Sequence, residues 1–455
     1  MTERLAAVQQ AQAQSQARQT GGEGIKPRSL WKPPTIATIE DTGINMIALA
    51  DLAIKILYFS GFKTGYQMAE IIKLPFTGIM DQVMELLKRE KWVEVKGTGG
   101  FGEGAFQYVI TEAGSNKARE VLDRSQYAGP APVTLEAYSQ AIMDQQYKTS
   151  VNQAEMVAAL RHLVVSEEIL NKVGPAVNSA ASIFLYGPPG NGKTTISEAV
   201  GRLVLGKDMY IPYAIDIDGQ IVQIFDSVNH EPIEEEVVEK PGTGQLKKGA
   251  KRDPRWIRIR RPVIIVGGEL TLDGLDLVYD STNKFYEAPF QVKANGGMFL
   301  IDDFGRQQVR PRDLLNRWIV PLEKRVDYLT LHTGRKLEVP FDVMIVFSTN
   351  LEPRDLVDEA FLRRIRHKIE IGDPSFEEFR EIFKRVCVAK GVEYTDKGLA
   401  YLLQEWYISQ DRKLRAVHPR DILNQLVDIA DYLGVPAVLT KDLIDRACHS
   451  YFVEI

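Results

Sequence analysis

Residues 187–194 read Gly-Pro-Pro-Gly-Asn-Gly-Lys-Thr, and this octapeptide decides the fold of the central part of the chain. It matches the pattern G-x-x-x-x-G-K-[ST]. The apolar run 183–186 precedes it and predicts a buried strand, and residues 195–204 follow it with the pattern of a helix. In this context a glycine-rich loop turns its backbone N–H groups around a β-phosphate. The octapeptide therefore predicts a phosphate-binding site.

The loop supplies most of the candidate nucleotide-binding residues. Lys193 provides a point charge for the β- and γ-phosphate oxygens, and the hydroxyl of Thr194 is placed to bind Mg²⁺. The expected nucleotide-binding residues of this segment are Gly187, Pro188, Pro189, Gly190, Asn191, Gly192, Lys193, Thr194 and Thr195. An Asn-Lys-x-Asp guanine-reading motif is absent, because Asn283-Lys284 is followed by Phe285-Tyr286. ATP with Mg²⁺ is therefore expected rather than GTP.

Two further apolar runs end in polar residues. Residues 298–301 lead into Asp302 and Asp303, and residues 343–349 lead into Asn350. We expect Asp302 to hold Mg²⁺ through water. Asp303 is expected to orient or deprotonate the attacking water, because a general base must lie within one water of the γ-phosphate.

With these segments in place, the chain resembles the AAA+ ATPases (ATPases associated with diverse cellular activities). The resemblance covers about residues 152–455 and identifies 187–194 as Walker A, Asp302-Asp303 as Walker B and Asn350 as sensor 1. It implies an α/β P-loop NTPase core with a parallel sheet in the order 5-1-4-3-2 and an α-helical lid. It also implies that Asn350 hydrogen-bonds the attacking water or the γ-phosphate.

The resemblance extends to two arginine sites. Residues 358–365 are similar to the arginine-finger segment, in which Arg364 is the primary candidate and Arg363 the second. Such a cation offsets charge on a neighbouring subunit's γ-phosphate, although a basic helix end facing its own dipole is the alternative. Arg420 stands where sensor 2 is expected, at the start of a lid helix. A finger of this kind implies a ring, a hexamer or similar.

One residue departs from the family pattern. Most relatives have Asp-Glu in Walker B, whereas this chain has Asp302-Asp303. The side chain of Asp is one methylene shorter than that of Glu. The departure bears on the turnover rate and not on nucleotide binding.

Residues 35–126 predict a small separate domain with the element order of a winged helix-turn-helix. Three helical segments precede two alternating strands around a glycine-rich tip, and another helix follows. Its ten Lys/Arg and twelve Asp/Glu give a net charge of −2, and the candidate recognition helix carries Asp81, Gln82 and Glu85. Duplex binding requires several phosphate-neutralising cations. Protein docking or a structural role is therefore favoured over DNA binding.

The remaining boundaries follow composition. Residues 1–34 are Ala- and Gln-rich and predict a disordered tail, as a tether or a docking peptide. Residues 127–150 begin with Gly-Pro turns and are interpreted as a linker. The core is expected at 151–372, with 210–215 as its second strand and an insertion at about 218–295, and the lid at 373–455. The basic run 247–261 alternates like an exposed strand that could meet nucleic acid, an acidic partner or an adjacent subunit.

The subtype is indicated by two further segments. Residues 294–305 resemble the Walker B entry of bacterial enhancer-binding proteins, magnesium chelatases and MoxR-like ATPases. Residues 328–339 predict a hairpin that resembles the pre-sensor-1 hairpin, with His332 as a pore candidate or simply a turn residue. The Gly-Ala-Phe-Thr-Gly-Ala loop of the enhancer-binding family is absent, so sigma-factor remodelling is not supported.

Composition limits the classes of function. The 455 residues suggest about three domains, and the net charge of −5 excludes a globally basic nucleic-acid coat. Two cysteines exclude a disulfide framework and a Cys-rich zinc site. The sequence has neither an apolar run of the ~18 residues that span a bilayer nor an N-terminal signal pattern. A cytoplasmic protein without a membrane span is expected.

These observations predict a ring-forming, ATP-hydrolysing motor that remodels or assembles a protein client. A nucleic-acid-dependent ATPase, a loader or DNA-associated regulator that uses the N-terminal domain and the basic run, is the alternative. A nucleotide-gated scaffold with little turnover is a third hypothesis.

Overall fold

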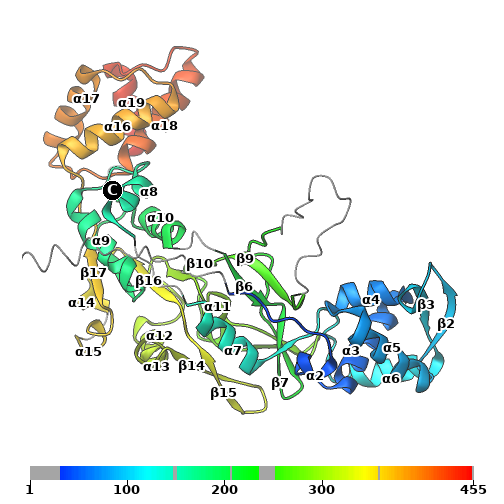
Figure 1. Cartoon of the computed structure of the whole chain (residues 1–455). Coiled ribbons are helices and arrows are strands. Elements are labelled where there is room, and N and C mark those ends of the chain that lie inside the picture. The colour runs from blue at the N-terminus through cyan, green and yellow to red at the C-terminus, as the bar shows by residue number, and fades with distance from the viewer. Residues whose placement is uncertain (1–30, 147–150, 205–207, 235–251, 357–358, 453–455) are drawn as a thin grey trace, which may run out of the picture.

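The computed structural model describes residues 31–146, 151–204, 208–234, 252–356 and 359–452. In Figure 1 an N-terminal domain (blue) and a C-terminal helical lid (orange to red) lie at opposite ends of a central α/β core. Most of the predicted tail, residues 1–30, and the basic residues Lys247, Lys248 and Lys251 lie outside the described residues.

Five parallel strands form the central sheet of the core. In spatial order they are β10 (Val263–Val266), β13 (Met298–Ile301), β16 (Met344–Thr349), β5 (Ile183–Tyr186) and β17 (His367–Glu370). All four pairings are parallel. Numbered along the chain and read from the β17 edge, the order is 5-1-4-3-2, so the predicted fold class is confirmed. The strands β10, β13, β16 and β5 have almost continuously apolar sequences, as is typical of parallel strands, whereas the edge strand β17 (His-Lys-Ile-Glu) is mostly polar.

Helices cover both faces of this sheet. On one face lie α8 (Gln153–Leu160), α9 (Glu167–Ser179) and α10 (Lys193–Val204), which pack against Ile183, Leu185 and their neighbours. On the other face Trp318, at the junction of α12 (Pro311–Arg317) and α13 (Ile319–Lys324), packs with Phe184. Successive β5 residues therefore enter opposite cores, as the alternation of a strand requires.

The second strand of the core is not the one expected from the sequence. Residues 210–215 were expected there, but β6 (Asp208–Pro212) pairs antiparallel with β9 (Trp256–Arg260) outside the central sheet. The second strand is β10, whose sequence Val-Ile-Ile-Val is apolar throughout. An apolar run is typical of a strand in a parallel sheet, although β10 lies at its edge and Ile265 is 44% exposed. Met209, Tyr210 and Ile211 of β6 are buried in the core of the insertion instead.

The insertion lies on both sides of β10 in the sequence, instead of forming the single stretch 218–295. Its five-stranded sheet has the order β11 (Val278–Asp280), β12 (Phe285–Glu287), β8 (Gln220–Gln223), β7 (Ala214–Ile217) and β4 (Val133–Thr134). A short helix, α11 (Phe290–Lys293), then leads back to β13. The insertion is therefore a second folded unit beside the core.

The segment expected to be a linker, 127–150, is folded over its described part. β4 pairs in parallel with β7 of the insertion, and α7 (Leu135–Asp144) buries Tyr138, Ala141 and Ile142. The Gly-Pro signature correctly predicted a break in regular secondary structure, but the apolar residues after it are buried in the core of the insertion.

The hairpin predicted before sensor 1 is confirmed. β14 (Val326–Thr330) and β15 (Lys336–Pro340) pair antiparallel in register. Its tip does not stand alone: the ring of His332 stacks on Tyr279 with centroids 4.3 Å apart, and its Nδ1 bonds the hydroxyl of Tyr286. Arg335 pairs with Asp218 in the β7–β8 turn. The hairpin is thus attached to the insertion sheet.

The N-terminal domain has the expected order of helices and strands. Its elements are α2 (Ile39–Thr42), α3 (Met46–Ser60), β1 (Phe62–Thr64), α4 (Gly65–Ile72), η1 (Phe76–Met80), α5 (Asp81–Arg89), β2 (Val93–Thr98), η2 (Glu103–Ala105), β3 (Phe106–Ile110) and α6 (Glu112–Leu122). The three strands form an antiparallel sheet in the order β1-β3-β2. The third helix was expected from Phe76, but Thr77 and Gly78 are not helical, and the carboxylate of Asp81 accepts the Gly78 N–H at 2.9 Å.

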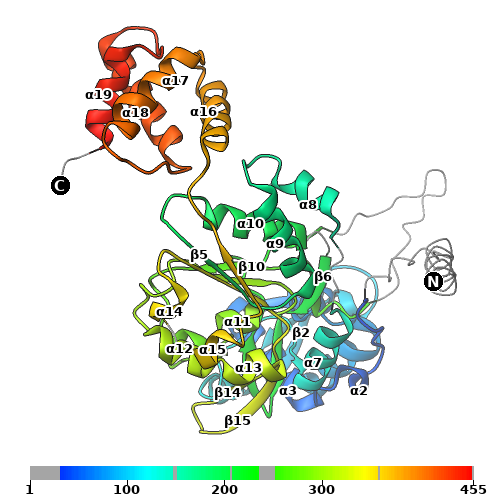
Figure 2. The same ribbon diagram turned by 90° about the vertical axis from the view of Figure 1, so that its left-hand side faces the viewer.

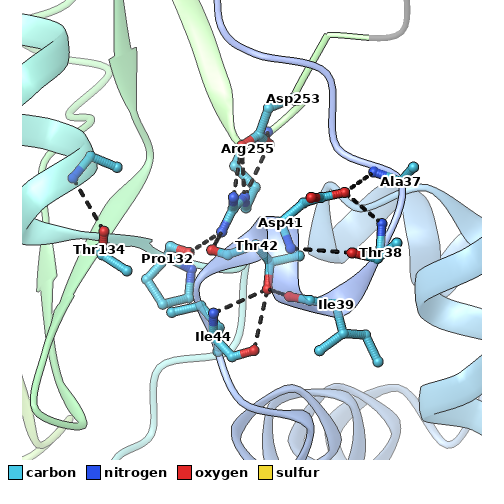
Figure 3. A network of polar contacts seen from close by, with 11 residues as sticks. Ala37, Thr38, Ile39, Asp41, Thr42, Ile44, Pro132, Thr134, Asp253 and Arg255 are labelled. Atoms are coloured by element: carbon cyan, nitrogen blue, oxygen red, sulfur yellow. Dashed lines mark hydrogen bonds and ion pairs between the residues drawn. The ribbon is translucent and has the colours of Figure 1, made fainter.

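A buried ion pair fixes this domain to the insertion (Figure 3). The side chains of Arg255 and Asp253 are 4% and 1% exposed and lie 2.7 Å apart. Arg255 Nη1 also donates to the carbonyls of Thr42 and Pro132, each at 2.8 Å. Three distant segments of the chain therefore meet at one guanidinium.

The lid is a bundle of helices joined to the core after β17 (Figure 2). It contains α16 (Phe376–Lys390), α17 (Asp396–Leu403), η4 (Gln404–Ile408), α18 (His418–Leu433) and α19 (Lys441–Tyr451). The sequence predicted an α-helical lid after residue 373, and these helices confirm it. Among the described residues, none of the helices is long and apolar enough to cross a membrane.

Candidate nucleotide-binding site

The phosphate-binding loop lies between β5 and α10, as the motif predicts. Gly187 has a φ of 129° and Gly190 a φ of 80°, values that residues with a side chain rarely adopt. A Cβ on Gly187 would also lie 2.4 Å from the carbonyl oxygen of Ile371. Glycine at these positions lets the loop pass close to β17 and turn its N–H groups inward.

Lys193 is buried at the base of the loop, where it is 7% exposed. Its ammonium donates to the carbonyls of Gly187 and Pro188, both at 2.9 Å, and to Asn350 Oδ1 at 2.7 Å. Burial lowers the pKa of Lys193 below its usual value, and the carboxylates of Asp302 and Asp303 oppose that shift. Lys193 of the loop is thus hydrogen-bonded to Asn350, the residue predicted as sensor 1.

Thr194 and Asp302 form the candidate Mg²⁺ site. The Thr194 hydroxyl donates to Asp302 Oδ2 at 2.8 Å. A hydroxyl and a carboxylate oxygen are hard ligands of the kind that Mg²⁺ prefers, and Mg²⁺ usually adds waters and phosphate oxygens to one or two protein ligands. No cluster of three or more His, Cys, Asp or Glu side chains suited to a metal occurs in the described residues. The pair therefore fits a nucleotide-bound Mg²⁺ and not a cation held by protein alone.

Asp303 and Asn350 lie at the ends of two adjacent parallel strands, β13 and β16. Asn350 Nδ2 donates to Asp303 Oδ1 at 3.1 Å. Asp303 is exposed and has φ 48°, a left-handed conformation that Asp and Asn tolerate better than most residues. A single water above these two side chains could be held by both, which suits the predicted roles.

A cavity of about 560 Å³ lies between the loop, the Walker B and sensor 1 residues and the lid. Its volume is within the usual range for small-molecule sites, roughly 300–1,000 Å³. One wall is apolar and comes from residues 163–165 of the core and from Ile382 and Val386 of α16. Arg385 Nη1 ties these two sides together by donating to the carbonyls of Arg161 and Leu163.

This apolar wall was not predicted from the sequence. Its residues are ordinary apolar positions without a motif, and the two sides lie more than 200 residues apart. The sequence shows only that these residues are apolar, and the packing of the lid shows that they face a cavity while half-buried. The wall suits the flat apolar faces of a base.

Arg420 reaches the cavity from the lid, as predicted. It is in the first turn of α18 and is one of the lining residues. Its side chain is 63% exposed, and Nε lies 2.9 Å from Asp421 Oδ1. The two terminal nitrogens of the Arg420 guanidinium are not part of this contact and can donate to an anion.

The two arginine-finger candidates lie elsewhere. Arg364 Nε donates to Glu323 Oε1 of α13 at 2.6 Å, while Arg363 is exposed after α15 (Glu359–Leu362). Neither is among the described residues that line the cavity of their own chain. Asp358, the first residue of the predicted segment, lies outside the described residues.

The described part of the basic run, residues 252–261, contains the strand β9, but this strand is only partly exposed and its arginines have partners within the chain. Arg255 and Arg261 are buried, at 3% and 8% exposure, and Arg261 donates to the carbonyls of Gly296 and Gln145 at 2.6 Å. Arg258 pairs with Asp208, and Arg260 pairs with Glu231. The buried cations Arg255 and Arg261 stabilise the insertion because their guanidinium groups are hydrogen-bonded within the chain, whereas the exposed pair of Arg260 contributes little.

Comparisons with known proteins give weak likenesses. The family model described as a domain of unknown function (DUF8689) matches residues 375–450, which form the lid. No curated protein matches the chain. NtrX from Brucella abortus in complex with ADP is 14% identical, with a TM-score of 0.38 over 64% of this chain and 56% of that chain. A mutant of RuvB from Thermotoga maritima is 12% identical, with a TM-score of 0.36 over 62% of this chain and 69% of that chain.

The chain thus spans little more than half the length of that NtrX structure. At such scores the fold assignment rests on the strand order of the core sheet and on the site, and not on these likenesses.

Proposed function

We propose that this protein is an ATP-hydrolysing AAA+ motor that forms a ring, a hexamer or similar, and remodels or assembles a protein client. One observation carries the proposal: Lys193, Thr194, Asp302, Asp303 and Asn350 meet at one cavity that the lid closes. This combination of a buried cation, a hydroxyl–carboxylate pair and an exposed carboxylate serves phosphoryl transfer to water.

The residues divide the work of hydrolysis. Lys193, which now donates to the loop carbonyls, would bind the β- and γ-phosphate oxygens, and Thr194 and Asp302 would hold Mg²⁺. Bound Mg²⁺ neutralises charge on the phosphates. Asp303 accepts the proton of the attacking water while Asn350 orients it. Arg420 approaches the γ-phosphate from the lid.

The ring follows from the arginines. Arg364, or Arg363 in its place, lies outside the cavity of its own chain, and a neighbour's cavity is where such a cation would stabilise the transition state. The pairing with Glu323 holds Arg364 in a defined orientation.

A protein client is favoured over nucleic acid. The N-terminal domain, which we interpret as a winged helix, has a net charge of −2 over residues 35–126, and the described arginines of the basic run are engaged within the chain. A net negative N-terminal domain and internally paired arginines are unfavourable for binding the phosphates of nucleic acid. The hairpin and the insertion are then the parts that contact the client, as in the MoxR-like and magnesium-chelatase cores. A cytoplasmic location is part of the proposal, and both cysteines are free and buried.

The test is nucleotide binding and ATP hydrolysis by the full chain and by Lys193→Ala. We expect Lys193→Ala to lose both, because the charge that the loop aims at the phosphates is removed. Lys390→Ala, an exposed lysine at the end of α16, is the matched control and is expected to behave like the wild type. Equal binding and hydrolysis by Lys193→Ala and the wild type would overturn the proposal.

A second measurement separates the two client classes. The ATPase rate is measured with single-stranded DNA, duplex DNA and RNA. We expect no stimulation by any of them. A clear stimulation would favour the alternative, a nucleic-acid-dependent ATPase. If no nucleic acid stimulates the ATPase, capture of a protein by Asp303→Asn in the presence of ATP would identify the client.

A further inference from the structure

The side-chain amide of Asn191 is hydrogen-bonded to the hinge after β17 and to the lid, although the residue belongs to the glycine-rich loop and lines the cavity. It is 7% exposed. Its Nδ2 donates to the carbonyl of Gly372 at 3.0 Å and to Asp373 Oδ1 at 2.8 Å, and its Oδ1 accepts the N–H of Ala416 at 3.1 Å. Both amide hydrogens and the amide oxygen are therefore used to join the loop to the hinge after β17 and to the lid.

Two neighbouring contacts strengthen this junction. The N–H of Val417 donates to the carbonyl of Gly190 at 2.9 Å, and Arg415 pairs with Asp373. A Cβ on Gly190 would lie 2.6 Å from Val417 Cγ1, so the backbones approach closely here. Consecutive loop residues thus bind consecutive lid residues.

We propose that Asn191 is a positioning residue that latches the lid to the phosphate-binding loop and so sets the place of Arg420 and the rate of nucleotide release. The proposal rests on the ATPase function proposed above. Residues 415–417 lead directly into α18, whose first turn carries Arg420. A change in the loop when phosphates bind is transmitted to the lid through these bonds.

The coupling works in both directions, as linkage requires. When the loop closes around phosphates, it holds Ala416 and Val417 and keeps the lid over the cavity. When the lid swings out, it pulls on Asn191 and Gly190 and loosens the loop. Departure of the nucleotide is then tied to movement of the lid, the part of the chain that carries the predicted sensor 2.

Hydrogen exchange of the full chain tests the latch without any reliance on hydrolysis. In Asn191→Ala the amide of Ala416 loses its acceptor, so we expect the amides of Ala416 and Val417 to exchange roughly tenfold faster. The interior of α18 is expected to keep its protection, which excludes unfolding of the lid. Asn178→Ala is the matched control, since Asn178 makes a similar two-way amide contact with Val151 outside the site. Unchanged exchange at residues 416–417 would overturn the latch.

Release of a fluorescent ADP analogue gives a second readout. We expect roughly tenfold faster release from Asn191→Ala than from the wild type or Asn178→Ala. Asp373→Ala is expected to act in the same direction, and the double variant to be no faster than the faster single one, because both remove one junction. Additive effects in the cycle would contradict a shared latch. A wild type that binds no nucleotide would defeat the proposed function but leave the exchange result as the test of the latch.

Discussion

Arg255 and Asp253 form a bidentate ion pair that is almost fully withdrawn from solvent, with Nε and Nη2 of the arginine both bound to the carboxylate. The remaining contacts of the guanidinium reach carbonyls 213 and 123 residues away in the sequence. The N-terminal domain is therefore built onto the insertion, which also holds the hairpin, and is not carried on a free linker. In the proposed motor these three parts would move together.

Arg255→Ala is predicted to destabilise the protein strongly. It leaves the buried carboxylate of Asp253 without a partner, and breaking a buried pair in this way costs about 3–5 kcal/mol. Urea denaturation, followed by fluorescence, measures the free energy of unfolding. Arg260→Ala removes an exposed arginine of the same segment and is expected to change it by less than about 1 kcal/mol. Equal stability of the two variants would contradict the role given to the junction.

Asp303→Asn is predicted to abolish turnover and leave the fold intact. Asn tolerates the left-handed backbone of this position as Asp does, so the loss is chemical. We expect kcat to fall by roughly 10²-fold or more, the usual contribution of a general base, with nucleotide affinity unchanged. Steady-state ATPase assays and nucleotide titration check both parts. An unchanged kcat would show that Asp303 is not the general base. It would favour the third hypothesis, a nucleotide-gated scaffold with little turnover.

Arg364→Ala is predicted to lower kcat by roughly 10³-fold, the lower range for an arginine finger, without loss of nucleotide binding. If the finger acts on a neighbour, mixing this variant with Lys193→Ala subunits restores part of the activity, since each supplies what the other lacks. Arg366→Ala, an exposed arginine two residues on, is the control. Inactivity of Arg363→Ala with an active Arg364→Ala would move the finger to Arg363. Full activity of both would exclude this segment.

Acid is predicted to destabilise the lid through His418. Burial, with help from Arg415 and Arg412, lowers the pKa of His418 to about 4, and Asp421 and Asp373 oppose the shift. In the unfolded chain the pKa is about 6.5. Between these two values the unfolded state binds more protons, so stability falls as the pH is lowered through this window.

The size of this effect is modest because His418 is partly accessible. Between pH 7 and pH 5 we expect a loss of about 1–2 kcal/mol from this group. Unfolding of the wild type and of His418→Gln at both pH values isolates it, since the glutamine does not titrate. An equal loss in the variant would assign the acid sensitivity to other groups.

The local motifs were readable in the sequence because their geometry is local. Gly187 and Gly190 must be glycine for the backbone of one loop, and the apolar strands before Asp302 and Asn350 place both residues at the same edge of a parallel sheet. The hairpin at β14–β15 and the lid helices follow from periodicity of neighbouring residues. These features need no knowledge of distant contacts.

The errors in the sequence interpretation have one physical cause. The strand β10 was overlooked in favour of residues 210–215, the segment 127–150 was interpreted as a linker, and the arginines of the basic run were expected on the surface. In each case the outcome depends on partners far away in the chain: β4 on β7, Arg255 on Thr42 and Pro132, Arg261 on Gln145. The sequence shows which residues are apolar or charged, but it does not show which distant residues they pack against or pair with.

The sequence alone was enough to predict the α/β core and its helical lid, and to nominate the residues of a nucleotide site, because short segments with fixed backbone geometry define them. The three-dimensional packing was needed to show that the N-terminal domain, the insertion and the hairpin are connected, and that the amide of Asn191 bonds the hinge and the lid. Those features depend on hydrogen bonds and ion pairs between separate segments of the chain, in several cases more than 100 positions apart. Their energies depend on exclusion of water, which folding alone creates.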